Sequence, residues 1–185
     1  MKEPTLSEAI VASGFFQEGT SFAGSNIFAL TPSRCCSPLD LVFVGVHNPY
    51  WTAQFSAFAS NVASANCPAC VTVTKRMPKG LRWHAKTFIG SVAGVPRIGI
   101  IGSSNLTRPA ADTSKPFNYE ADVVLWHEAD TAIDKIVTSQ FENTQDGSHE
   151  VIVTTYEQGG PNGPLSLQAR LESLRNEIIE SSRVV

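Results

Sequence analysis

No run of apolar residues in this 185-residue chain approaches the roughly 20 residues that a helix needs to span a bilayer. The first ten residues also lack the charged and then apolar segments of a secretory signal. The sequence contains no internal repeat. We therefore expect a cytoplasmic protein that has no membrane partner.

The chain has no excess of positive charge either. Lysine and arginine number 14, against 17 aspartate and glutamate residues, so the formal net charge is −3. This balance argues against a strongly basic nucleic-acid binder, although a local positive groove can exist on an acidic protein. Six cations lie near the strands that we expect at 82–91 and 97–104, and they could form either a solvated rim or a groove for DNA: Lys75, Arg76, Lys79, Arg82, Arg97 and Arg108.

Cysteine is scarce, with four residues in the chain. Cys67 and Cys70 have the two-residue gap that is found in many zinc and redox sites. A second such pair is missing, because Cys35 and Cys36 are adjacent and neighbouring residues cannot easily bind one metal ion together. We expect reduced, partly buried thiols, with a metal site as the alternative interpretation.

The chain does have a globular composition, with 42% hydrophobic and 17% charged residues, and it is long enough for one domain spanning residues 1–185. Residues 39–46 are apolar on both faces and predict a buried strand. Residues 53–65 have apolar side chains at spacings of three and four, which is typical of a helix. Residues 71–77 alternate as a strand does. Strand, helix and strand in this order predict a crossover between parallel strands.

The remaining segments predict further alternation of strands and helices, and hence an α/β fold. We expect strands at 9–16, 82–91, 97–104 and 119–126, a late strand or an extended segment at 150–156, a loop at 106–117, helices at 130–141 and 165–180, and a Gly/Pro break at 159–164. Residues 92–96 would join two of these strands as a hairpin. If Gly94 and Val95 are the central turn residues, His84 lies opposite Asn105 and Lys86 lies opposite Ser103.

Three polar pairs at a spacing of two lie in these predicted strands or directly beside them: His84 with Lys86, Ser103 with Asn105, and Asn118 with Glu120. Residues two apart on a strand share one face. An imidazole beside an ammonium is unfavourable unless an anion lies between them. Phosphate suits this set best, because the other side chains can donate hydrogen bonds to it or orient the imidazole. The alternative is an ordinary polar surface.

The same residues resemble the catalytic motif of the phospholipase D superfamily, which is H-x-K, then G-S-x-N, then N-x-E. Here these segments are His84-Ala85-Lys86, Gly102-Ser103-Ser104-Asn105 and Asn118-Tyr119-Glu120. The resemblance implies a mixed, largely buried β-sheet with helices on both faces. It also implies a phosphodiesterase that requires neither a metal nor another cofactor. The histidine would attack phosphorus or protonate the leaving group, Lys86, Asn105 and Ser103 would bind the phosphate, and Glu120 would orient His84.

Two features depart from the family pattern. Ser91 stands where the family has an aspartate, five positions after the lysine, which affects structural support more than chemistry. The gap before Gly102 is also longer than usual. In addition, the motif occurs once, whereas the mechanism needs two histidines, and the other histidines (His47, His127 and His149) lack a lysine partner. We therefore predict a homodimer that brings two copies of His84 together.

Superfamily members with a single motif are chiefly nucleases, so the resemblance favours an endonuclease that cleaves DNA. A separate DNA-reading domain or subunit would compensate for the acidic charge. One alternative is a phospholipase or a hydrolase of small phosphodiesters, for which Trp51, Phe55 and Trp83 could supply an apolar entrance. The other is a catalytically silent binding module, which Ser91 in place of aspartate would favour.

Overall fold

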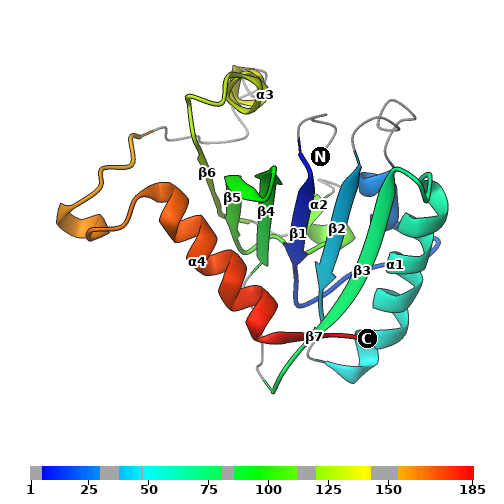
Figure 1. The fold of residues 1–185 in the computed structure, drawn as a ribbon. Coiled ribbons are helices and arrows are strands. Elements are labelled where there is room, and N and C mark those ends of the chain that lie inside the picture. Colours follow the sequence, from blue (N-terminus) through cyan, green and yellow to red (C-terminus); the bar gives the residue numbers. More distant parts are fainter. Residues whose placement is uncertain (1–5, 30–37, 47, 81–85, 112–119, 143–153) are drawn as a thin grey trace.

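The computed structural model describes residues 6–29, 38–46, 48–80, 86–111, 120–142 and 154–185. Within these residues a mixed seven-stranded sheet has the order β6-β5-β4-β1-β2-β3-β7 (Figure 1). Its strands are β1 Glu8–Ala12, β2 Leu39–Val44, β3 Val71–Pro78, β4 Lys86–Val92, β5 Val95–Gly102, β6 Asp122–Trp126 and β7 Ser182–Val184. Strands β1, β2 and β3 are parallel, and the other pairs are antiparallel. The predicted α/β class and the predicted parallel crossover are confirmed.

Helices and helical turns connect these strands. They are η1 Gly24–Phe28, η3 Pro49–Trp51, α1 Thr52–Ala65, α2 Arg108–Ala111, α3 Thr131–Glu142, η4 Gly160–Asn162 and α4 Leu167–Glu180. Helix α1 lies where the spacing of apolar residues predicts it, within one residue at its start. Helix α4 begins after the Gly/Pro break, where the Ser166 hydroxyl accepts a hydrogen bond from the Ala169 N–H and caps the helix.

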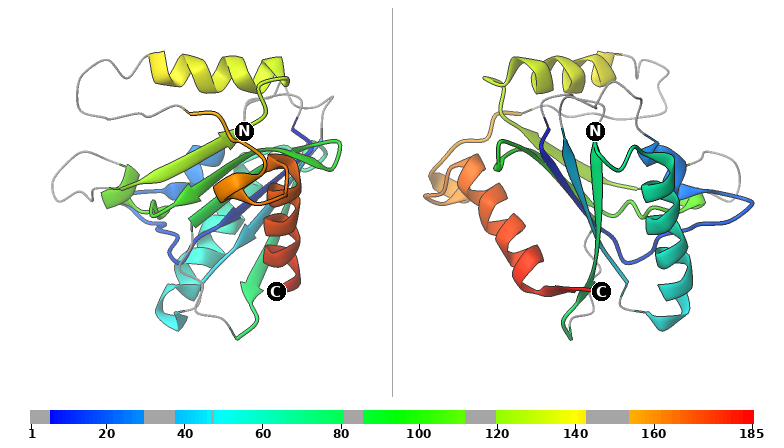
Figure 2. Two further views of the ribbon diagram at one scale, coloured as in Figure 1. Left: turned by 90° about the vertical axis from the view of Figure 1, so that its left-hand side faces the viewer. Right: turned by 45° about the vertical axis from the view of Figure 1, so that its right-hand side comes forward.

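The core has two layers, one on each face of the sheet (Figure 2). On one face, phenylalanine rings from α1 pack against the sheet, and Phe16 and Phe58 lie 4.9 Å apart between ring centroids. On the other face, Ile178 of α4 packs against Ile10 and Ile89. The sheet therefore has helices on both faces, as the sequence predicts, because both sides of its central strands are apolar.

The hairpin between β4 and β5 differs from its predicted register. Its central turn residues are Ala93 and Gly94, which have φ angles of 50° and 78°. Positive φ at both positions is typical of a primed two-residue turn, so the predicted turn at Gly94 and Val95 was wrong. An irregularity between Gly90 and Ser91 then shifts the pairing by one residue. Consequently Lys86 pairs with Gly102 and not with Ser103.

Several element boundaries also differ from prediction. Strand β5 ends at Gly102, before Ser103, and β6 begins after Glu120. Part of the predicted loop at 106–117 is the short helix α2, residues 154–156 form no regular strand, and the C-terminal strand β7 was not predicted. Among the described residues, none of the helices combines the length and apolar character that crossing a lipid bilayer requires.

Candidate functional site

The candidate site lies where several strands end on one edge of the sheet. Lys86 begins β4, and it lies directly opposite Gly102, which ends β5 and lies opposite Asp122 of β6. Directly opposed residues on neighbouring strands share one face, so these three positions form a row across the sheet. Ser103 and Asn105 follow β5 in a loop, and Glu120 precedes β6. The prediction that these three residues lie on strands was therefore wrong, although they still gather at this edge.

Lys86 is a buried cation, with a residue exposure of only 6%. Burial lowers the pKa of its ammonium group, because removal from water disfavours the charged form, and the nearby Glu120 carboxylate partly opposes this effect. Glu120 is thus close enough for its charge to act on Lys86. A desolvated ammonium at the end of a strand interacts strongly with nearby anions, because little water screens its charge.

Glu120 is held in place by Ser103. The Ser103 hydroxyl donates to Glu120 Oε2 at 2.6 Å and accepts a hydrogen bond from the Ala121 N–H at 3.0 Å. The Ser103 N–H in turn donates to the Ala121 carbonyl oxygen at 3.2 Å, so the pairing of β5 and β6 continues past Gly102. The hydroxyl proton of Ser103 is directed at Glu120. For Ser103 to donate to a phosphate, as the resemblance implies, it would have to release this carboxylate.

Asn105 is held by Ser13, a residue that the sequence does not single out. Ser13 follows β1 and is only 2% exposed. Its hydroxyl lies 3.3 Å from Asn105 Oδ1 and 2.9 Å from the Phe15 carbonyl oxygen, and it can donate to either. Because Oδ1 of Asn105 accepts this bond, the amide nitrogen is the end of the side chain that can donate to an anion.

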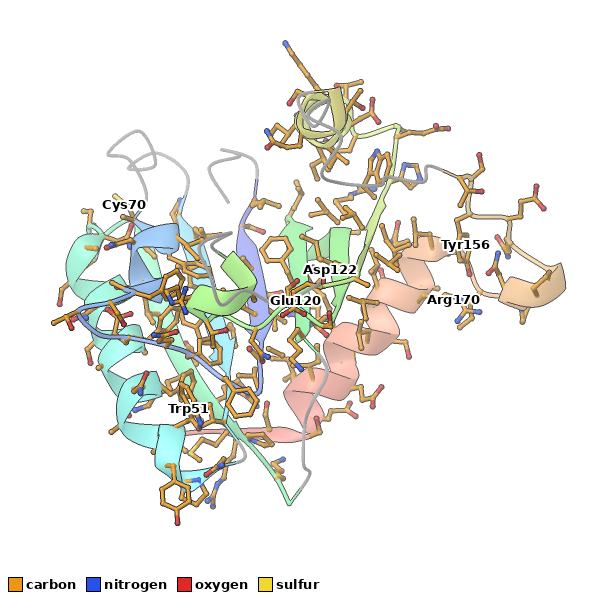
Figure 3. The ribbon with its side chains drawn as sticks, turned by 180° about the vertical axis from the view of Figure 1, so that it is seen from behind. Trp51, Cys70, Glu120, Asp122, Tyr156 and Arg170 are labelled. Atoms are coloured by element: carbon orange, nitrogen blue, oxygen red, sulfur yellow. The ribbon has the colours of Figure 1, made fainter. Side chains whose placement is uncertain are left out.

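Gly102 allows a second carboxylate to enter the site. A Cβ atom at this position would lie 1.8 Å from Asp122 Oδ1, so the Asp122 side chain occupies the space that any other residue would fill. Asp122 accepts hydrogen bonds from the N–H and the hydroxyl of Ser104. Figure 3 shows Glu120 and Asp122 beside one another at this edge of the sheet. The glycine of the G-S-S-N segment is therefore required by close packing.

Sequence reasoning missed Ser13, Ser104 and Asp122. A signal existed for two of them, because Ser104 lies inside the motif and Asp122 is two residues from Glu120. Ser13 had a weaker signal: it is a small polar residue at the carboxyl end of a parallel strand, where open α/β sheets commonly bind ligands. The predicted strand at 9–16 ran through this position and concealed it.

The six cations do not form one continuous groove in the described residues. Arg76 donates to the Ile179 carbonyl oxygen at 2.8 Å, and Lys79 donates to the Glu180 carbonyl oxygen at 2.9 Å. Both therefore stabilise the C-terminal end of α4, where cations are favoured. Arg97 lies near the far end of β5 from Gly102, and Arg82 is outside the described residues. Arg76 and Lys79 therefore have a structural role, which weakens the hypothesis of a DNA groove.

The other predicted groups are only partly described. Cys67 is exposed and Cys70 is buried, whereas Cys35 and Cys36 lie outside the described residues. The part of the chain that the structure describes contains no group of three or more His, Cys, Asp or Glu side chains that could hold a metal ion. Phe55, one of the residues suggested for an apolar entrance, is 1% exposed in the core, and Trp83 is not described.

Lys86, Ser103 and Glu120 thus lie together where β4 and β6 begin and β5 ends. Asn105 is placed near them through Ser13, which follows the β1 residue paired with Thr87, and Asp122 binds Ser104. His84 and Asn118, the other two polar residues of the motif, lie outside the described residues. No protein-family model matches the sequence, and no curated protein is detectably similar to it.

Proposed function

We propose that this chain is a metal-independent phosphodiesterase with a phospholipase D-like fold, and that it acts as an endonuclease on DNA. The observation that carries the proposal is that Lys86 and Glu120 interact at one end of the sheet, where Ser13 of the neighbouring strand also holds Asn105. These residues come from three separate segments, and each segment has the order and spacing of the superfamily motif. A buried ammonium, an oriented amide and a carboxylate are what a phosphate site needs beside its histidine.

The proposed reaction has two steps. An imidazole nitrogen of His84 attacks phosphorus, and the bond from phosphorus to the leaving oxygen breaks. The His84 of a second protomer gives its proton to that oxygen. Water then attacks the phosphohistidine, the phosphorus–nitrogen bond breaks, and the second histidine takes up the proton of the water. Lys86 and Asn105 donate to the non-bridging oxygens throughout, and they stabilise the charge that develops in each transition state.

The buried position of Lys86 supports this role. An ammonium in water is already well solvated and gains little from a phosphate. Lys86 has lost most of its contact with water, so solvent screens its attraction for a phosphodiester anion less than it would at the surface. Because Ser103 and Ser13 hold Glu120 and Asn105, little reorganisation is needed when the substrate binds.

The contacts of Ser91 favour an enzyme over a silent binding module. Ser91 is fully buried, and its hydroxyl lies 3.4 Å from Oε1 of Glu8, the residue that also binds Arg175 of α4. Ser91, which departs from the family pattern, therefore lies on the face of the sheet that α4 covers. Asn105 contacts Ser13 on the opposite face, where the aromatic core lies. A carboxylate is still present beside position 91, since Glu8 supplies it from β1.

Cleavage in the absence of divalent metal tests the proposal. Plasmid DNA is incubated with the protein in EDTA, beside the variants His84→Ala and His127→Ala. We expect nicking by the wild type and a loss of about a hundredfold or more in His84→Ala, the usual contribution of an acid–base or nucleophilic group. His127→Ala is the matched control, because His127 lies beyond β6, away from the site, and should retain its rate within about twofold. Cleavage that depends on added metal, or that persists in His84→Ala, would contradict the mechanism.

A further inference from the structure

Asp122 is a carboxylate of the candidate site that neither the motif nor the proposed mechanism uses. It begins β6 and lies opposite Gly102, the last residue of β5. A Cβ atom on Gly102 would lie 1.8 Å from Asp122 Oδ1 and 2.6 Å from the Ala121 carbonyl oxygen. The Asp122 side chain therefore packs closely over the glycine, and from there its carboxylate reaches Ser104 in the loop that follows β5.

Four consecutive residues of this loop, 103–106, each have a hydrogen-bond partner in another segment of the chain. In order along the loop, these partners are Ala121, Asp122, Ser13 and Gln17. Ser104 is held at two points, because its N–H lies 3.3 Å from Asp122 Oδ1 and its hydroxyl donates to Oδ2. Asn105 follows directly, so the bonds to Ser104 restrain the backbone from which the Asn105 side chain projects.

We propose that Asp122 is a positioning residue of the phosphate site, and that it holds Asn105 in place through Ser104. This inference rests on the proposed phosphodiesterase function, in which the Asn105 amide donates to a phosphate oxygen. Ser13 restrains the far end of the Asn105 side chain, and Asp122 restrains the backbone at its near end. With both ends held, the amide is oriented before the anion arrives, and binding does not have to order it.

The negative charge of Asp122 allows this role to be separated from an electrostatic one. A carboxylate beside a phosphate site repels the anion, so its charge alone weakens binding. The bonds to Ser104 act in the opposite direction, because they orient the amide. Asparagine at position 122 removes the charge but can keep both bonds, since its carbonyl oxygen accepts from the Ser104 N–H and its amide donates to the Ser104 hydroxyl. Alanine removes the charge and the bonds together.

Titration with inorganic phosphate tests the inference without any need for cleavage. Nuclear magnetic resonance of the full chain follows the side-chain amide of Asn105, whose signals are identified by their loss in Asn105→Ala. We expect Asp122→Ala to bind phosphate about tenfold more weakly than the wild type, the order of change that lost hydrogen bonds produce. Asp122→Asn should bind it at least as tightly as the wild type. Asp40→Ala is the control, because Asp40 is exposed and lies beside Glu8 at the other end of the sheet.

A double-mutant cycle shows whether Asp122 acts through Asn105. In the plasmid assay, Asp122→Ala should lower the rate by about tenfold in the wild-type background. The same substitution should have little further effect in Asn105→Ala, since the amide that it positions is already absent. A general loss of structure would lower the rate equally in both backgrounds. Because Asp122 is exposed, its replacement should leave the protein folded.

The outcomes separate this inference from the proposed function. Tighter phosphate binding by both Asp122 variants, or equal binding by Asp122→Ala and the wild type, would overturn the inference even if DNA is cleaved. Weaker binding by both variants would assign the effect to the charge and would also overturn it, as would a wild type that binds no phosphate. Phosphate binding that Asp122→Ala weakens and Asp122→Asn retains, in a protein that cleaves no phosphodiester, would support the inference and refute the proposed chemistry.

Discussion

Lys86 is the side chain at which burial and charge oppose each other most directly. Removal from water lowers its pKa, and the attraction of Glu120 raises it by a smaller amount. The proposed mechanism needs the ammonium form, which donates to the phosphate. The proposed activity should therefore fall at alkaline pH, because the pKa of Lys86 is lower than the value of about 10.4 that is usual for a lysine.

We predict that the rate of phosphodiester cleavage falls as the pH rises, and that this alkaline limb of the pH profile has an apparent pKa below about 10.4. Glu120→Gln should move this limb to still lower pH, because the attraction that opposes desolvation is removed. The measurement is kcat/KM against pH for the wild type and the variant. Glu128→Gln, at an exposed position, is the control and should leave the limb in place. A shift to higher pH in Glu120→Gln would show that another group controls it.

The lowered pKa of Lys86 also has a consequence for stability. The unfolded chain binds its lysine proton more tightly than the folded chain does, so between the folded pKa and about 10.4 unfolding takes up protons. The contribution of Lys86 to the free energy of unfolding therefore rises with pH in that window. Replacement by methionine should flatten this rise, which urea unfolding at several pH values can measure without any assay of activity.

Glu8 connects β1 and β4 to helix α4. It binds Arg175 through two hydrogen bonds, from Nε at 2.7 Å and from Nη2 at 2.8 Å, and the Ser91 hydroxyl lies 3.4 Å from Oε1. The hydrogen bond from Arg175 to Glu8 raises the pKa of the guanidinium. One carboxylate of β1 thus contacts both the neighbouring strand β4 and helix α4. The local ion pair therefore does not need an aspartate at position 91.

We predict that Ser91→Asp destabilises the protein by roughly 2 kcal/mol or more, because a second buried carboxylate would face Glu8 with a single arginine to share. Combining it with Glu8→Ser should recover at least half of the loss, since the carboxylate is then moved and not duplicated. Urea unfolding measures each free energy of unfolding. Thr138→Asp, on the exposed side of α3, is the control and should change it by at most about 0.5 kcal/mol. Simple additivity of the two substitutions would show that they do not share one site.

Local patterns predict the elements of this fold much better than they predict its register. The strands at 39–46 and 71–77 and the helix between them follow from apolar periodicity, because burial on both faces or on one stripe leaves a clear spacing. The hairpin register was wrong by one residue, since neither Ala93 with a positive φ nor the irregularity after Gly90 has a signature in the pattern. Strand β7 has three residues, which is too few for any period to appear.

The candidate site could be predicted as a set of residues but not as an arrangement. The order of the motif identified Lys86, Asn105 and Glu120 without any coordinates. Its support could not be found in this way, because Ser13 lies 92 positions from Asn105 in the sequence and meets it only when β1 is placed beside β4. Contacts of this kind depend on strand order, which the sequence does not display.

The molecule as a whole carries one copy of the motif, and this limits what a single chain can do. The site lies at the end of the sheet where β4 and β6 begin and β5 ends. The sequence contains one histidine with a lysine two residues after it. The proposed reaction needs one group to attack phosphorus and another to protonate the leaving oxygen. If both groups are His84, the active unit contains two chains of 19.9 kDa, and each chain supplies one histidine to a shared active site.

We predict that activity falls with the square of the wild-type fraction when wild-type and His84→Ala chains are mixed. A dimer with one intact His84 lacks either the nucleophile or the acid, so a random equal mixture should retain about a quarter of the activity, whereas independent protomers would retain about half. Co-refolding ensures that chains exchange, and light scattering establishes the mass of the assembly. Mixing the wild type with Tyr156→Ala is the control and should leave the activity unchanged. A linear loss, or full activity in a monomer, would show that the second catalytic group belongs to the same chain.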